Sequence, residues 1–163
     1  MSEARRLIKE LGNKEIANRN LKHSETNDCV VRAIQHAFVV EYIDAHHFCE
    51  VKLHRVKRNG VYTRRYLTLI NQAFGQKIKS IKATRPKKTK VEVYSEAKEK
   101  SVTKRIVKHV PYDVKGFVKT FNEGNYIVIV KKHAFAVVNG KIFGNYEDDK
   151  KVSKSIHMIF KVN

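Results

Sequence analysis

The C-terminal third of the sequence constrains the fold most, because its apolar residues follow the spacing of β-strands. Residues 126–130 form an almost continuous apolar run, which is typical of a strand buried on both faces. A second strand is expected over 133–138, and Asn139-Gly140 then predicts a two-residue hairpin turn into 141–143. A last strand is indicated by the alternation of Ile156, Met158 and Phe160. The chain is therefore expected to end in an antiparallel sheet of about four to five strands.

The residues before this sheet have the spacing of helices. Helical patterns cover residues 2–12, the stretch from Asn27 or Asp28 to about Val40, a stretch capped at Asp44, and 63–75. A short helix with its cap at Asp113 is expected directly before the sheet. Because helices precede an antiparallel sheet, and 163 residues suffice for one core, the prediction is a single α+β domain over residues 1–163.

Residues 79–109 interrupt this pattern with many lysines and few large apolar side chains. We expect a basic insertion, either a mobile arm or a twisted hairpin that projects from the domain. As a binding element it would contact phosphates through six cations and stack bases on Tyr94. These cations are Arg85, Lys87, Lys88, Lys90, Lys104 and Arg105. The alternative is a solvated loop, and the absence of known DNA- or RNA-reading motifs predicts contacts to the backbone only.

Charge and cysteine content narrow the class of protein. Lys and Arg total 34 against 16 acidic residues, for a net charge of +18, which attracts polyanions. The alternative is a lysine surface that serves solubility alone. The apolar runs are too short to span a membrane, and the N-terminus lacks the apolar segment of a signal peptide. Two cysteines make no disulfide framework, so reduced thiols and a cytoplasmic location are expected.

Cys29 stands where a helix is expected to begin, in the stretch TNDCVVRAIQHAF. A helix N-terminus lowers the pKa of a thiol, and an imidazolium from a separate element lowers it further. His133, at the start of an expected strand, is the candidate partner. A lone cysteine is more often a buried core residue, and this is the role expected of Cys49.

Metal binding and cofactors are not expected. The nearest candidate for a zinc site is HHFC, residues 46–49, but its spacing does not match that of zinc ligands. We expect this stretch to lie along a helix with one histidine exposed.

Four segments together resemble a family of small papain-like cysteine peptidase-related proteins of tailed bacteriophages. They are TNDCVVRAI, GVYTRRYLTLINQAFG, DVKGFVKTFNEGNYIVIVKKHAFAVVNGKIFGN and SIHMIFKVN, and they cover roughly three quarters of the chain. The N-D-C triplet and the hairpin led by histidine are the most specific pieces. The resemblance implies a papain-like fold with Cys29 as nucleophile and His133 as base.

The third catalytic group is where this sequence departs from the family. Relatives usually carry an acid eleven residues after the histidine, where this chain has Gly144 followed by Asn145. A regular strand would point Asn145 away from His133, whereas a bulge at Gly144 would turn it toward the ring. Asp148 is the alternative. The resemblance also suggests Asn27 as an oxyanion donor, although Asn27 fits a helix cap equally well.

Two functions from different classes follow. The first is a phage-encoded cysteine hydrolase that cleaves peptide or isopeptide bonds of a protein substrate, or transfers the acyl group. It would act in the host cytoplasm, with packaging in the virion as an alternative. The second is a catalytically silent papain-like scaffold whose basic surface binds nucleic acid or an acidic host protein. The sequence leaves the substrate and the oligomeric state open.

Overall fold

The computed structural model describes residues 5–8, 26–56, 58–61, 72, 78–144 and 153–162. Within these ranges, helices α3 (Cys29–Phe38) and α4 (Tyr42–Leu53) precede the strands, and α6 (Val114–Thr120) interrupts them. One antiparallel sheet contains β1 (Ile78–Ile81), β4 (Asn125–Val130), β5 (His133–Val138), β6 (Lys141–Phe143) and β7 (Ile156–Val162). Its strand order is β1-β7-β4-β5-β6. The fold is therefore α+β with a five-stranded antiparallel sheet, as predicted.

The hairpin between β5 and β6 has the turn that its sequence predicts. Asn139 and Gly140 both have positive φ angles, of 47° and 74°, and Val138 pairs with Lys141 across the turn. This is the geometry of a type I′ turn, which the sequence Asn-Gly favours. The Asn139 side chain also accepts a hydrogen bond from the Gly124 N–H at 3.0 Å, so the turn is tied to the start of β4.

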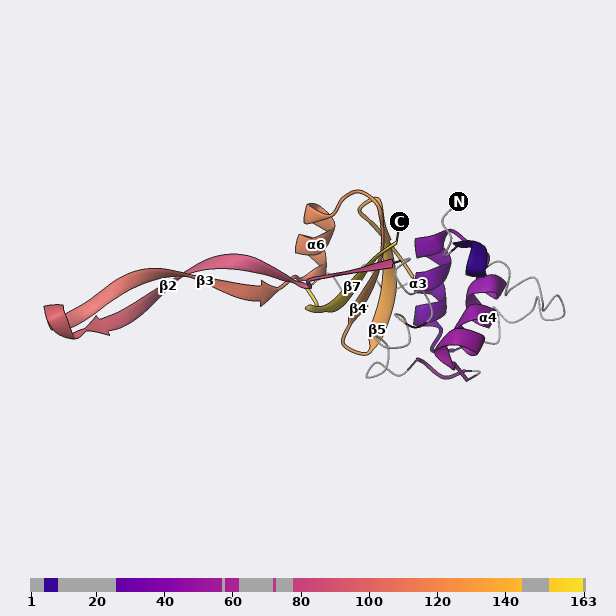
Figure 1. Cartoon of the computed structure of the whole chain (residues 1–163), viewed down its shortest axis with the longest axis horizontal. Helices are drawn as coiled ribbons and strands as arrows, with labels where there is room; N and C mark the ends of the chain where they lie inside the picture. The colour runs from indigo at the N-terminus through magenta and orange to yellow at the C-terminus, as the bar shows by residue number, and fades with distance from the viewer. Residues whose placement is uncertain are drawn as a thin grey trace.

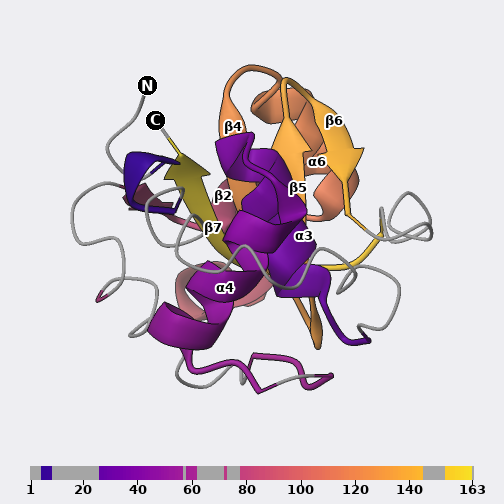
Figure 2. The ribbon, with the colours of Figure 1, turned by 90° about the vertical axis from the view of Figure 1, so that its right-hand side faces the viewer.

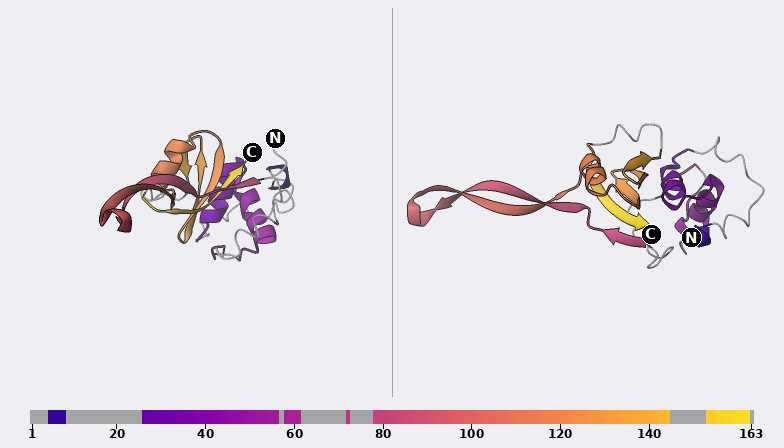
Figure 3. Two further views of the ribbon diagram at one scale, coloured as in Figure 1. Left: turned by 60° about the vertical axis from the view of Figure 1, so that its left-hand side comes forward. Right: turned by 90° about the horizontal axis from the view of Figure 1, so that it is seen from above.

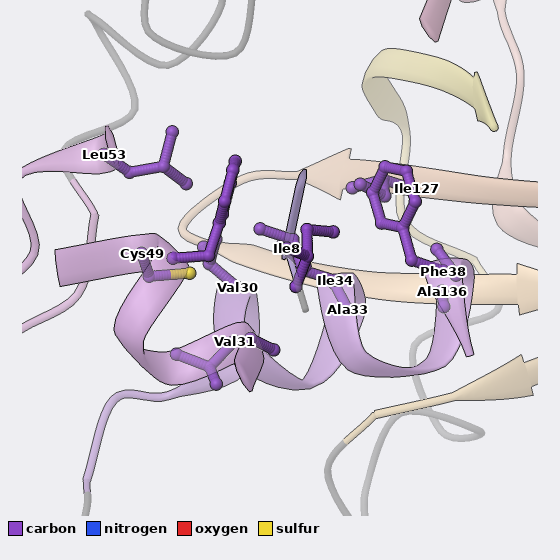
Figure 4. Packing of buried hydrophobic residues seen from close by; sticks show 14 of the residues in the cluster. Ile8, Val30, Val31, Ala33, Ile34, Phe38, Cys49, Leu53, Ile127 and Ala136 are labelled. Carbon is purple, nitrogen blue, oxygen red and sulfur yellow. The ribbon is translucent and has the colours of Figure 1, made fainter. Parts of the chain in front are cut away.

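Helices α3 and α4 cover one face of the sheet, and α6 covers the other (Figure 1). On the α3 side, Ala33 and Ala37 are fully buried against residues that include Ala134 and Ala136 of β5. Small side chains on both elements let the helix lie close to the sheet. Figure 4 shows this core from close by, with Ile34 and Phe38 in it.

The α6 face has a more aromatic core. Phe117 is fully buried, and its ring lies 5.3 Å from that of Tyr126 and 4.8 Å from that of Phe121. The helix begins where predicted, because the Asp113 carboxylate accepts a hydrogen bond from the Gly116 N–H at 2.6 Å. Edge-to-face and stacked rings of this kind contribute beyond the apolar area they bury.

The basic insertion is a twisted two-stranded ribbon that projects far from the body of the molecule (Figures 1 and 3). Strands β2 (Thr84–Ser95) and β3 (Lys100–Pro111) pair along their whole length, and the short 3₁₀ helix η2 (Glu96–Lys98) joins them. We call residues 84–111 the arm. Of the two alternatives, the hairpin is the one observed. The predicted insertion also includes residues 79–81, but these pair with β7 as part of β1, so the arm starts later.

Two helix boundaries differ from expectation. α3 ends at Phe38, because Val39 adopts a left-handed conformation with φ of 54°. α4 begins at Tyr42, and Asp44 lies within its first turn rather than at its cap. The helices expected over 2–12 and 63–75 fall largely outside the described residues, of which 5–8 and 72 are helical.

Candidate active site

Cys29 and His133 are brought together by the packing of α3 on the sheet. Cys29 is the first residue of α3 and His133 is the first residue of β5. The two side chains are joined by a hydrogen bond between thiol and imidazole. Figure 2 shows α3 lying in front of β5. The pair is partly buried, since both residues are of intermediate exposure.

The environment of the Cys29 thiol favours its ionised form. Burial raises the pKa of this thiol, but four other effects outweigh it and leave the pKa below its ordinary value. These are the hydrogen bond to His133, the N–H of Ala134, the charge of His133 and the N–H of Val30. Hydrogen bonds and positive charge stabilise a thiolate and have no such effect on a thiol. The Cys29 thiol is therefore ionised more readily than an ordinary thiol.

His133 reaches the thiol because it stands at the very end of its strand. Strict alternation places it on the face of Phe135, the α6 face, and its ring lies 6.2 Å from the Phe135 ring. It pairs with Val130 across the two-residue turn Lys131-Lys132. At this edge the imidazole is able to contact the start of α3, which lies over the other face.

A buried carboxylate fixes the start of α3 next to the thiol. Asp28 is only 4% exposed, and its Oδ2 accepts hydrogen bonds from Arg32 Nε and from the Tyr42 hydroxyl, both at 2.9 Å. The Arg32 guanidinium also lies 5.8 Å from the centre of the Tyr42 ring. Arg32 stands four residues after Asp28, so the two side chains meet across one turn of the helix. The part played by Tyr42, which comes from α4, does not follow from the sequence.

A second buried polar pair ties the incoming chain to the end of α4. Arg55, 4% exposed, donates one hydrogen bond to His46 Nε2 at 3.0 Å and another to the Thr26 carbonyl at 3.2 Å. Thr26 lies three residues before Cys29, so Arg55 helps to hold the approach to the helix. Sequence reasoning missed both residues. Arg55 gave only the signal of a charged residue just after α4, and His46 was considered only as part of HHFC.

The second thiol provides a contrast. Cys49 is fully buried among apolar residues of α3 and α4 (Figure 4), as its expected structural role requires. Burial raises the pKa of Cys49 far above the ordinary thiol value.

The expectation that one histidine of residues 46–49 is exposed is wrong, because His46 is 1% exposed and His47 is half-buried. Among the described residues, no three His, Cys, Asp or Glu side chains gather as a metal site.

The remaining predicted site residues are not joined to the pair by the described contacts. Asn27 has a positive φ of 54°, and its side-chain amide donates to the Arg58 carbonyl at 3.1 Å. Asp28 rather than Asn27 occupies the N-cap position, without a side-chain cap bond. The role of Asn27 as an oxyanion donor stays a prediction. Asn145 and Asp148 lie outside the described residues.

Beside His133 lies an open pocket of about 560 Å³ at the end of the sheet. It is lined by residues of the β4–β5 turn, of the approach to β7 and of β7 itself. These residues are Lys131, Lys132, His133, Lys154, Ser155 and His157. Among the described residues that line the pocket, none is acidic.

The six predicted polyanion contacts all lie on the arm, but on two different faces. Lys88, Lys90 and Arg105 share one face with the 63% exposed ring of Tyr94. Arg85, Lys87 and Lys104 share the other. Arg85 lies at the base, where its guanidinium is 5.7 Å from the centre of the Tyr112 ring. Like charges stand directly opposite each other at Lys90 and Arg105, and again at Lys87 and Lys108.

Comparison with other proteins adds no assignment. No protein-family model matches the chain, and neither a curated protein nor a solved structure matches it significantly. In the part of the chain that is described, no helix is both long and apolar enough to cross a membrane.

Proposed function

We propose that the protein is a cysteine-dependent hydrolase of papain-like type that acts on peptide or isopeptide bonds of a protein substrate. The observation that carries the proposal is the hydrogen bond between the Cys29 thiol, at the start of α3, and the imidazole of His133. The resemblance of the N-D-C and histidine-hairpin segments to phage papain-like proteins supports it, and with it a place of action in the host cytoplasm.

The chemistry needs only groups at this site. The Cys29 thiolate attacks the carbonyl carbon, and its negative charge moves to the carbonyl oxygen, where backbone N–H groups at the start of α3 stabilise it. The carbon–nitrogen bond then breaks, and protonated His133 gives its proton to the leaving amine. Water, with its proton taken by His133, hydrolyses the resulting thioester and restores the thiol. An amine in place of water would make the reaction an acyl transfer.

An activated ester tests the nucleophile without knowledge of the natural substrate. We expect p-nitrophenyl acetate to release a rapid burst of one equivalent of nitrophenol, with the acetyl group found on Cys29 by mass spectrometry. Cys29→Ala should abolish the burst, and His133→Ala should slow it by on the order of a hundredfold, the usual contribution of a general base. Cys49→Ala is the matched control and should leave the burst unchanged. Acetylation without preference for Cys29 would overturn the proposal.

A second function, binding of nucleic acid through the arm, is favoured by its like-charged pairs. Opposed cations at Lys90/Arg105 and at Lys87/Lys108 destabilise a ribbon that has no core of its own. The arm carries nine Lys or Arg against three Glu. A polyanion would relieve this repulsion, and released counterions would drive binding. The arm and the dyad are separate, so both functions are compatible with one chain.

The salt dependence of duplex binding tests the arm. Neutralising Lys87, Lys90, Arg105 and Lys108 with glutamine should weaken affinity for a mixed-sequence DNA duplex. It should also flatten the plot of log affinity against log salt by about 0.9 for each phosphate that the arm no longer neutralises. Lys79→Gln/Lys161→Gln is the control, since these two lysines also face each other across a ladder, but in the body. If both variants lose the same affinity for each charge removed, binding depends on net charge alone. That result would contradict a specific role of the arm in binding nucleic acid.

A further inference from the structure

The pocket beside His133 is a site of concentrated positive charge. Three lysines line it, two from the β4–β5 turn and Lys154 from the chain before β7. Ser155 and His157 add a hydroxyl and a second imidazole. Ammonium groups, a hydroxyl and imidazoles are all hydrogen-bond donors for an anion. The pocket therefore has the chemistry of a receptor for a carboxylate or phosphate group.

Two backbone irregularities lie in the segments that form this pocket. The ladder between β4 and β7 pairs Ile129 with Met158 and Val130 with Ile156, so it skips His157. Such a bulge re-aims a side chain, and the exposed His157 lines the pocket. Lys132 adopts a left-handed conformation with φ of 59°, which is unfavourable for a residue with a Cβ atom. Asparagine or glycine would fit that position better, so a contribution of the lysine side chain would explain its presence.

We propose that this pocket binds the carboxylate of an acidic residue on the leaving half of the substrate. The inference rests on the proposed hydrolase function. In that reaction His133 protonates the leaving amine, so the leaving half of the substrate lies on the imidazole side of the thiol. Residues just beyond the scissile bond then reach the groups on that side of His133, which are the lysines, Ser155 and His157.

A bound carboxylate also assists the chemistry. The imidazole of His133 must be protonated beside the thiolate, and the titratable groups that face the pocket with it are Lys131, Lys132, Lys154 and His157. The positive charge of the three lysines opposes protonation of the ring, while the negative charge of the Cys29 thiolate favours it. A substrate carboxylate among these lysines offsets their effect. An acidic substrate would in this way favour the reactive ion pair as it binds.

The binding step is tested by NMR on the imidazole signals of the full chain at constant ionic strength. We expect N-acetyl-glutamyl amide to shift the signals of His157 and His133 saturably, and N-acetyl-glutaminyl amide, which has the same shape without charge, to leave them in place. Lys132→Gln/Lys154→Gln should weaken binding of the glutamyl compound roughly tenfold, the loss expected for one charge-assisted hydrogen bond.

The control variant is again Lys79→Gln/Lys161→Gln, which removes the same charge at the far end of β7 and should bind normally. Unsaturable shifts, equal shifts with the glutaminyl compound, or equal weakening in both variants would overturn the proposal. N-acetyl-phosphoseryl amide distinguishes the two anion sources. If the phosphoryl compound binds more tightly than its extra charge explains, the site is one for phosphate. That result would overturn the assignment to a carboxylate.

The ester burst, measured on the same samples, separates this proposal from the proposed function. A burst at Cys29 without saturable binding of the glutamyl compound overturns the pocket alone. If the glutamyl compound binds saturably, and Lys132 and Lys154 are needed, but no burst is seen, the pocket is an anion site. The proposed hydrolase function is then overturned.

Discussion

The body and the arm are built from the same antiparallel pairing, yet only the body encloses a core. In β4, the central strand of the body, five of six residues are buried, and helices cover both faces of its sheet. In β2 and β3 no described residue is buried. An isolated two-stranded hairpin is at best marginally stable in water. The body can therefore fix the relative positions of two side chains, those of Cys29 and His133, whereas the arm presents charge.

This difference separates stability from binding. Substitutions in the body should change the free energy of unfolding and the geometry of the dyad. Substitutions in the arm should change interactions with partners and leave the body intact.

Phe117→Ala should have the largest effect on stability. The side chain is fully buried and contacts the rings of Tyr126 and Phe121, so its removal leaves a cavity between α6 and the sheet. We expect the free energy of unfolding, measured by urea denaturation, to fall by about 3–5 kcal/mol. A loss below about 1 kcal/mol would indicate that α6 is not packed as described.

Tyr42→Phe should have the next largest effect, because it removes one donor from the buried Asp28 carboxylate. A hydrogen bond to a charged group contributes about 1.5–3 kcal/mol, and we expect a loss of that size in the same measurement. Tyr94→Phe is the matched control in the arm, where the ring is 63% exposed, and should cost nothing measurable. Equal losses at the two tyrosines would contradict the contrast between the regions.

Arg105→Glu should stabilise the arm while leaving the body unchanged. It places a carboxylate opposite Lys90 in the ladder, and an opposite-charge pair is worth about 0.2–1 kcal/mol. Amide hydrogen exchange in β2 and β3 should slow accordingly, whereas exchange in β4 should not change. Arg105→Gln removes the repulsion without adding attraction. Its exchange rates in the arm should lie between those of the unchanged protein and those of Arg105→Glu. Unchanged exchange in the glutamate variant would mean that the cross-strand charges do not interact, and faster exchange would contradict the expected stabilisation.

Val107→Ala should have the smallest effect. Val107 is 59% exposed on the arm, and a surface substitution of this kind changes the free energy of unfolding by no more than about 0.5 kcal/mol. Val137→Ala is its counterpart in the body, fully buried in β5, and should cost several times more. Similar costs at both valines would show that Val107 is buried in solution and would contradict the contrast between arm and body.

Local signals in the sequence predicted the elements that carry the site. The Asn139-Gly140 turn, the apolar run of β4 and the apolar stripe of α3 each follow from short-range rules, and they place Cys29 and His133 at element ends. β1 was missed because its sequence, Ile-Lys-Ser-Ile, is charged and lies within the lysine-rich stretch. It becomes a strand through pairing with β7, a partner far along the chain.

The surroundings of the dyad could not be predicted, because they are tertiary. Two sets of hydrogen bonds join α4 to the chain around the start of α3. Asp28 accepts from Arg32 and from Tyr42. Arg55 donates to His46 and to Thr26. The pocket depends on a register shift that singles out His157, and an alternating pattern gives no sign of it. The pairing of Cys29 with His133 could therefore be predicted from the sequence, whereas the side chains that position the pair and the pocket beside it could not.

The pH dependence of alkylation by iodoacetamide tests the account most directly. Because the pKa of Cys29 is lowered, a larger fraction of Cys29 than of an ordinary thiol, whose pKa is about 8.5, is ionised at a given pH. We predict that Cys29 in the native protein is alkylated at lower pH than an ordinary thiol, that Cys49 is not alkylated, and that His133→Ala moves the Cys29 profile to higher pH. Slow alkylation of both thiols over the same pH range, unchanged by His133→Ala, would contradict it.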